Sequence, residues 1–452
     1  MRKANPSNRK DGRNKGWSQR KTGMFSTGAF FKILPLCSLL AVVAVTGCSN
    51  GTSKTESHYT SAYTAEDANP ELAAATNRFA LDLYAKLEEE PGEADPGPNR
   101  MISPAGIGIA LSMLKGGAEG ETERQMDAML HLNGMSPEVL ADSQMILRDL
   151  LRGSDPAVKM DIANSLWSSQ GFEMDKDYVE QMEKSYGAQV QAIDFSSEQA
   201  ADILNKWASD NTAGKIPKVI DPPLSPDLVL LLMNAMYFKG DWSEPFEKGQ
   251  TEDLPFYPEI GGEVTVPTMR QSGEYAYLDG DGFEAVRLPY GETKNFGMIL
   301  ALPDENSSLD DFKQQQLPKF NEWSQNLSDN EGSIELPRFK LKDKFSLKAT
   351  LSALGMTDAF DDEKAELGGL VAGGAKPGSI FISFVTHDTF IEVNEEGTEA
   401  AAVTVIGAET TSAPAPREPF DLKLNRPFFF AITDRTTGAI VFMGEVGNPA
   451  EE

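Results

Sequence analysis

Reactive side chains are scarce in this chain of 452 residues, which holds two cysteines and three histidines. Cys37 and Cys48 both lie near the N-terminus, so we expect neither a disulfide nor a cysteine metal cluster in the rest of the chain. The motifs H-E-x-x-H, C-x-x-C and G-x-x-x-x-G-K are absent. The three histidines, His58, His131 and His387, support no Ser-His-Asp arrangement. We therefore predict that the protein is not an enzyme and uses no cofactor or metal.

The first 47 residues have the composition of an export signal. Residues 1–32 contain nine Lys or Arg and a single acid, Asp11, and the apolar run that follows at 33–45 is too short to span a bilayer comfortably. The run ends in Val45-Thr46-Gly47-Cys48, which resembles the lipobox of bacterial lipoproteins. The resemblance implies that residues 1–47 are removed and that Cys48 becomes the lipidated first residue of the mature chain.

A tether follows the signal. Residues 48–69 are rich in Ser, Thr, Asn and Gly and would reach about 25 Å as a random coil. We expect an exported lipoprotein held at the cell surface, in either the outer or the cell membrane, through its N-terminal lipid. The start of translation stays open between Met1 and Met24.

The charge of the chain is strongly acidic, at −28 overall. Removal of the signal takes away nine basic residues and one acidic residue, so 32 Lys or Arg then face 68 Asp or Glu and the mature net charge is −36. Such a chain would be repelled by nucleic acid. Residues 70–452 alternate helical and strand patterns without a repeat period, which predicts one α+β domain. We expect it to be a monomer.

Several elements can be placed from periodicity and capping signals. An amphipathic helix is predicted from Pro70 to just before Pro91, and Ser103 followed by Pro104 has the form of a helix N-cap. Thr122 with Gln125 predicts a capping box for another helix. The run 228–238 is apolar on both faces except for Asn234, which indicates a central strand covered on both sides. Further strands are predicted at 283–288, 297–302 and 333–336, and a hairpin at 428–432 and 439–443.

The run 394–406 is the most unusual segment of the chain. As a strand, it would place Thr398, Ala400, Ala402 and Thr404 on one uncharged face, and Gly397 would supply a hinge. Three prolines between residues 413 and 420 exclude a central strand there. The run is therefore either an ordinary sheet strand followed by a loop or a strand that becomes paired on a trigger.

A set of short motifs, in this order and spacing, resembles the serpin family over residues 70–449. The matching runs are Ile102-Ser103-Pro104, Leu204-Asn205-Lys206-Trp207, Gly214-Lys215-Ile216-Pro217, 234–242 (NAMYFKGDW), Leu336-Pro337-Arg338-Phe339, 395–402 (EEGTEAAA), Asn425-Arg426-Pro427-Phe428 and Phe442-Met443-Gly444. The resemblance implies a serpin fold, with a large, mostly antiparallel central sheet, further β-sheets, about eight or nine helices and an exposed reactive-centre loop at about 395–420.

The resemblance also implies a function and its residues. The function is suicide inhibition of a serine protease, which is trapped as an acyl-enzyme when the cut loop inserts into the central sheet. The implied hinge residues are Glu395, Glu396, Gly397, Thr398, Glu399, Ala400, Ala401 and Ala402. The residues implied to control opening of the sheet, in its shutter and breach regions, are Ser103, Pro104, Asn234, Trp242 and His387.

The reactive bond stays open. Counting from the hinge by the family's usual spacing places it at Thr411-Ser412, which would suit an elastase-like or subtilisin-like protease. The alternative, Arg417-Glu418, would suit a trypsin-like protease, although Pro416 makes it a poor cleavage site. The loop is also longer than in many relatives, which leaves the count open. Two further possibilities are a cysteine protease as target and a serpin-like surface binding protein that never inserts its loop.

Overall fold

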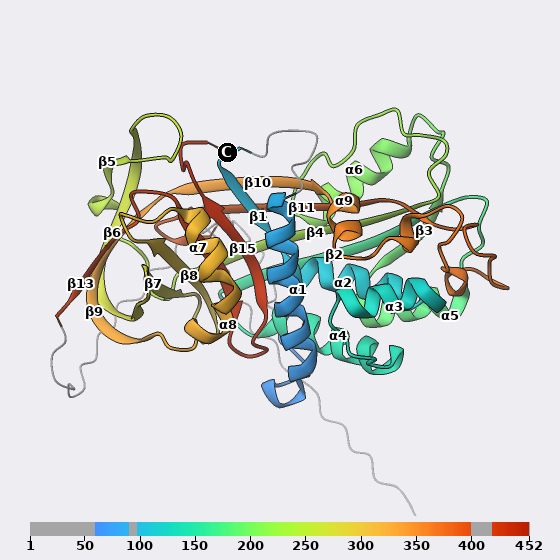
Figure 1. Cartoon of the computed structure of the whole chain (residues 1–452), viewed down its shortest axis with the longest axis horizontal. Helices are drawn as coiled ribbons and strands as arrows, with labels where there is room; N and C mark the ends of the chain where they lie inside the picture. The colour runs from blue at the N-terminus through green and yellow to red at the C-terminus, as the bar shows by residue number, and fades with distance from the viewer. Residues whose placement is uncertain (1–58, 90–96, 399–417, 452) are drawn as a thin grey trace, which may run out of the picture. The chain divides into compact units, whose positions relative to one another are not determined.

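The computed structural model describes residues 59–89, 97–398 and 418–451. The expected signal sequence and the first half of the expected tether, residues 48–58 including Cys48, lie outside this range. The second half is not the random coil expected, because the backbone N–H of Ala62 donates to the carboxylate of Asp149 and Ala65–Asp67 form a 3-10 helix. Within the described range, the chain forms two mostly antiparallel β-sheets and nine α-helices, which is an α+β fold (Figure 1). None of the described helices has both the length and the apolar composition needed to cross a membrane.

The smaller sheet has six strands in the order β10-β11-β12-β4-β2-β3. Most neighbours are antiparallel, but β11 also pairs with β4 in parallel, and so does β2 with β3. The strands are β2 (Val158–Ser169), β3 (Gln189–Ile193), β4 (Leu230–Asp241), β10 (Phe339–Ser346), β11 (Ile382–Asn394) and β12 (Gly397–Thr398).

The larger sheet has nine strands in the order β1-β15-β14-β8-β7-β6-β9-β13, with β5 paired to β6 off this path. The strands are β1 (Asn99–Ile102), β5 (Glu252–Phe256), β6 (Val264–Asp279), β7 (Phe283–Pro289), β8 (Phe296–Pro303), β9 (Ser328–Pro337), β13 (Phe420–Lys423), β14 (Phe428–Asp434) and β15 (Ile440–Val446). The predicted late hairpin is confirmed as β14 and β15.

The helices are grouped mainly in the N-terminal half of the domain. They are α1 (Pro70–Glu89), α2 (Pro104–Lys115), α3 (Gly120–Met129), α4 (Pro137–Gly153), α5 (Lys176–Gln181), α6 (Ala200–Asn211), α7 (Leu309–Gln315), α8 (Phe320–Trp323) and α9 (Lys348–Ala353). Helix α1 begins at Pro70 as predicted. Ser103 caps α2 by accepting a hydrogen bond from the backbone N–H of Gly106, and Pro104 follows at the first helical position.

The central strand β4 is covered on both sides, as its sequence predicts. Leu230, Leu232 and Met236 belong to the main hydrophobic core, whereas the alternate residues Leu231 and Met233 pack into a second core built around α6. Figure 1 shows α6 above β4 and β2, and α2 on the other side of them. The sheet is therefore the middle layer, with α6 on one face and α2 with its neighbouring helices on the other (Figure 1).

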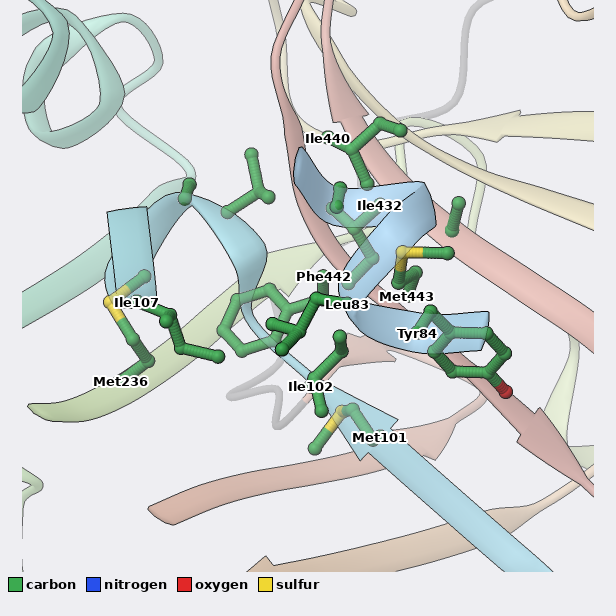
Figure 2. Close-up of a cluster of buried hydrophobic side chains, with 14 of the residues drawn as sticks. Leu83, Tyr84, Met101, Ile102, Ile107, Met236, Ile432, Ile440, Phe442 and Met443 are labelled. Carbon is green, nitrogen blue, oxygen red and sulfur yellow. The ribbon is translucent and has the colours of Figure 1, made fainter. Parts of the chain in front are cut away.

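The main core also joins the two sheets. Figure 2 shows side chains from α1, β1 and α2 meeting Met236 of β4 and residues of β14 and β15. Phe442 of β15 lies edge-on to Phe238 of β4, with 6.1 Å between ring centroids. Because this contact crosses from one sheet to the other, the two sheets pack as one body.

The predicted capping box at Thr122 and Gln125 is wrong. Helix α3 begins earlier, at Gly120, with Glu119 at the N-cap, so Thr122 lies inside the first turn. Its hydroxyl accepts a hydrogen bond from the backbone N–H of Glu366, and the side chain of Gln125 accepts from the backbone N–H groups of Thr357 and Asp358. Both side chains thus hold distant loops rather than their own helix.

Candidate functional site

The end of β11 leads directly into the segment that the sequence singles out. Strands β11 and β4 pair with each other in parallel from Ile382 with Leu230 to Phe390 with Tyr237. Beyond that point the two strands separate, and β12 fills the gap: Thr398 pairs with Val393 of β11 and with Gly240 of β4. The sheet is therefore closed along most of its length and holds a two-residue wedge at one end.

The sequence predicts an exposed reactive-centre loop from about residue 395, but Glu395 and Thr398 within that range are buried. Gly397 and Thr398 already form β12. The other implied hinge residues, Glu399, Ala400, Ala401 and Ala402, lie outside the described residues, as do Thr411, Ser412 and Arg417. Glu418 is described and is exposed just before β13.

Position 397 has to be glycine because the backbone of β4 approaches it closely. Its φ is +150°, and a Cβ atom added there would lie 2.1 Å from the carbonyl oxygen of Gly240 on β4. No other residue fits without moving that strand. The side chain of the next residue, Thr398, is fully buried, and its hydroxyl lies 2.7 Å from the hydroxyl of Tyr290. Burial also raises the pKa of Tyr290, which keeps this phenol protonated.

Glu395 anchors the turn that precedes this wedge. Its carboxylate is almost completely buried and accepts hydrogen bonds from the guanidinium of Arg338 and from the hydroxyl of Thr251. Burial opposes ionisation of this carboxyl, but these donors outweigh it and hold its pKa below the ordinary value. Neighbouring Glu396 forms an ion pair with Lys248. The turn is thus held by charged partners from β9–β10 and from the segment before β5.

Trp242 closes the same end of the sheet. Its indole N–H donates to the carbonyl oxygen of Asn394 at 2.9 Å, and its backbone N–H donates to that of Glu396 at 2.9 Å. The indole also stacks on Tyr290, with 4.2 Å between centroids and 11° between planes. Tyr290 also contacts Thr398, so a single side chain, that of Tyr290, connects Trp242 to the last residue of β12.

His387 lies further down β11, where the sheet is closed. Its Nε2 accepts the backbone N–H of Ser103 at 2.8 Å, so Nδ1 carries the proton and donates to Oδ1 of Asn234 at 2.8 Å. Asn234 in turn donates to Oδ1 of Asn164 on β2 at 2.8 Å. The hydroxyl of Ser103 bonds elsewhere, to the carbonyl oxygen of Val441. One buried polar chain therefore crosses β11, β4 and β2 and reaches the start of α2.

The sequence-predicted residues thus fall into two groups. Ser103, Pro104, Asn234 and His387 meet where α2 packs under the sheet, and Trp242 lies with the described part of the hinge at the open end. Sequence reasoning missed Tyr290 and Arg338 as hinge partners, and it missed Gly106, whose Cβ position would be 2.7 Å from Oδ1 of Asn234.

The site holds no arrangement for catalysis among the described residues. His387 touches only an amide and a backbone N–H in the network above, and burial lowers its pKa to about 3. No group of three or more His, Cys, Asp or Glu within the described ranges could hold a metal ion. What these contacts do is hold β11 against β4 and fix β12 where the two strands separate.

Comparison with known proteins agrees with this geometry. Residues 74–449 match the family model described as serpin, serine protease inhibitor. The chain belongs to the serpin family. It is 35% identical over 392 residues to the leukocyte elastase inhibitor of Homo sapiens, which covers 84% of this chain and 100% of that protein. Relatives of this kind are protease inhibitors rather than enzymes.

Solved serpin structures share the fold. The thermophilic serpin tengpin in its native state superimposes with a TM-score of 0.73 and 30% identity, covering 86% of this chain and 100% of that one. Human thyroxine-binding globulin in complex with its hormone gives a TM-score of 0.73 at 25% identity, covering 84% and 99%. The serpin fold expected from the motifs is confirmed.

The burial of His387 predicts a pH-dependent stability. The native protein excludes a proton from this imidazole down to about pH 3, whereas an unfolded histidine binds one near pH 6.5, so stability is lost as the pH falls. Between pH 7.5 and pH 5 we expect the free energy of unfolding of the unaltered protein to fall by about 2 kcal/mol relative to that of the His387→Gln variant. Denaturant unfolding of both proteins at the two pH values measures this difference.

Two buried carboxyl groups change the stability in the opposite direction as the pH falls, so their contributions have to be the same in both proteins. Burial raises the pKa of Asp343 and of Asp388 to about 7, so their native forms bind protons, and gain stability, as the pH falls. Because both proteins contain both aspartates, the difference isolates His387. Parallel pH profiles for the two proteins would contradict the assigned network.

Proposed function

We propose that this protein is a suicide-substrate inhibitor of serine proteases. The target cuts the loop beyond Thr398, and the freed upstream half then enters the six-stranded sheet between β11 and β4 before the acyl-enzyme can be hydrolysed. Entry drags the attached protease away from its productive geometry. Loop insertion of this kind is a form of β-strand addition.

The observation that carries the proposal is that β11 and β4 pair directly, in parallel, up to the point where they separate and β12 lies between them. A strand that continued from Thr398 would run antiparallel to both neighbours, so one parallel ladder would be replaced by two antiparallel ladders. Each backbone hydrogen bond gained contributes on the order of 1 kcal/mol. Insertion is therefore downhill once the far end of the loop is released.

The side chains that would enter are suited to the space. Thr398 is fully buried and faces Tyr290, so the face that it shares with Ala400, Ala402 and Thr404 would be the interior face of an inserted strand. All four are small and uncharged. A charged side chain at one of these positions would have to be desolvated at a cost of several kcal/mol, which slows insertion relative to hydrolysis.

Ala402→Arg tests the insertion step. We expect the variant to be cut by the protease as a substrate, with the SDS-stable complex reduced at least tenfold, because the guanidinium would have to enter the core. Thr398→Arg is a poorer choice, since Thr398 is already buried in the uncut protein. The measurement is a denaturing gel after incubation with pancreatic elastase, subtilisin and trypsin.

Glu399→Arg is the matched control. In an inserted strand, residue 399 would lie on the opposite face from Thr398, and it is already charged, so this variant should keep trapping protease. Equal trapping by Ala402→Arg and the unaltered protein would exclude insertion as the mechanism.

For the target, we propose an elastase-like or subtilisin-like serine protease that cuts at Thr411-Ser412. Small residues surround that bond, and the human relative is named an inhibitor of leukocyte elastase. Arg417-Glu418 and a trypsin-like target are the alternative, and a cysteine protease is a further one.

Mass spectrometry of the peptide released on inhibition decides between the two bonds. We expect a C-terminal fragment that begins at Ser412. A fragment that begins at Glu418 would assign the trypsin-like alternative instead.

A non-inhibitory binding protein is the second candidate function. Thyroxine-binding globulin, whose structure is similar, holds a small hormone. The small residues Ala400, Ala402 and Thr404 favour the inhibitor, because they can be buried without a charge or a proline on the interior face of an inserted strand. A binding protein of this second kind would form no SDS-stable complex with any of the three proteases.

We further propose that the chain is a bacterial lipoprotein, held by lipid on Cys48 at the outer face of a membrane. The proposal is supported by the basic region, the apolar run and the Val45-Thr46-Gly47-Cys48 pattern. Residues 59–69 are hydrogen-bonded to the domain, through Ser61 to Gly153 and Ala62 to Asp149 of α4, so only residues 49–58 would form the tether, with a reach of about 17 Å as a random coil.

Cys48→Ser tests the anchor. In cells fed a labelled fatty acid, we expect the unaltered chain to carry label and to sediment with membranes, and the variant to lose both properties. Label that persists in the variant would place the lipid elsewhere, and an unlabelled, soluble natural chain would exclude the anchor.

A further inference from the structure

The hairpin formed by β5 and β6 ends in an exposed apolar tip. Ile260, in the turn that joins the two strands, is 91% exposed, and Tyr257 at the start of that turn is 47% exposed. The other large hydrophobic residues exposed in the described chain are scattered over distant elements: Tyr59, Val139 and Ile203. A single exposed aliphatic residue is ordinary, but two within four residues form a small apolar surface.

The tip is held in place rather than free to fold back. Phe256 is completely buried at the end of β5 and pairs with Val264 of β6. The backbone N–H of Tyr257 donates to the carbonyl oxygen of Asn425 at 2.8 Å. Gly261, with φ of +107°, lets the chain turn directly after Ile260. The hairpin therefore presents Ile260 on a fixed support.

The hairpin contacts the chain on both sides of the expected reactive-centre loop. At one end, Thr251, the residue before β5, donates its hydroxyl to the Glu395 carboxylate, two residues before the Gly397 hinge. At the other end, Tyr257 bonds Asn425, which follows β13 where the chain returns to the sheet. Strands β5, β6, β9 and β13 lie together at one end of the domain (Figure 1). A protease that engages the chain between Thr398 and Glu418 thus has to approach this hairpin.

The charge around the tip has one sign. The stretch 251–269 contains four acids and no Lys or Arg. Asp253, Glu259 and Glu263 are exposed on it. The basic groups of the adjacent strands are paired with acids, Arg270 with Glu252 and Glu335, and Lys423 with Asp421.

We propose that the β5–β6 hairpin is a second docking contact for the target protease, separate from the bond that is cut. Its occupant is a surface of the protease beside the active-site cleft that is apolar at its centre and basic at its rim. Burial of Ile260 and Tyr257 would hold the complex together, and the acids would speed encounter with a basic partner. The inference rests on the proposed inhibitory function and adds a surface by which the inhibitor would select its target protease.

The test is the double variant Tyr257→Ser, Ile260→Ser in the full-length protein. With the proteases that the unaltered protein traps, and with leukocyte elastase as a further probe, we expect the second-order rate of inhibition to fall at least tenfold for one or more of them. The number of inhibitor molecules consumed per trapped protease should not change, because the loop and the sheet are untouched. Val139→Ser, which removes a half-exposed aliphatic residue from α4, is the control and should leave the rate unchanged.

A second measurement separates this proposal from the proposed function. Affinity for each protease with its catalytic serine replaced by alanine reports docking without acylation, and it should fall with the double variant. If the unaltered protein traps protease and the double variant is equally fast with every protease, the docking site is excluded and the inhibitor stands. If no protease is trapped but the inactive proteases bind through the hairpin, the proposed inhibition fails and the docking site stands. Absence of both trapping and binding would overturn both.

Discussion

The hydrogen-bonded pairing of β11 with β4 is the interaction on which the rest of the site depends. These strands run parallel and are joined directly from Ile382–Leu230 to Phe390–Tyr237. Where they separate, Gly397 and Thr398 fill the space and bond to both edges. The same two strands therefore close the sheet along most of its length and hold β12 where they diverge. Each contact described at the site acts on this seam, either along its closed part or at its open end.

The contacts at the two places differ in chemistry. Along the closed part, His387, Asn234 and Asn164 form neutral hydrogen bonds in a fully buried layer, where an unpaired polar group is costly. At the open end, Glu395 is held by Arg338 and Thr251, and Glu396 by Lys248, which is mostly exposed. The neutral network resists opening at any pH at which His387 stays unprotonated. The charged contacts hold the turn that leads into β12.

Sequence alone predicts the parts of this arrangement that have a local signal. Helix α1, the N-cap at Ser103 and the two-sided burial of β4 follow from spacing and composition, and the family motifs bring Asn234, Trp242 and His387 to attention. The long strand β6 was missed because its middle, residues 270–274, is polar and contains Gly273, which interrupts the alternation of a half-buried strand. Tyr290 and Arg338 were missed as hinge partners because they lie 108 and 57 residues from Thr398 and Glu395, where no periodicity reports a contact. The early pairing of Thr398 depends on how far β11 and β4 diverge, which is a tertiary property.

The stacking of Trp242 on Tyr290 has a practical consequence. Tyr290 follows β7 of the nine-stranded sheet, yet its hydroxyl contacts Thr398, and Trp242 bonds to the chain on either side of Glu395. Any advance or withdrawal of β12 must therefore change the surroundings of this indole, which is one of five in the chain. The protein carries its own fluorophore at the entrance of the sheet, so the motion of the hinge can be followed optically in real time without attaching a dye.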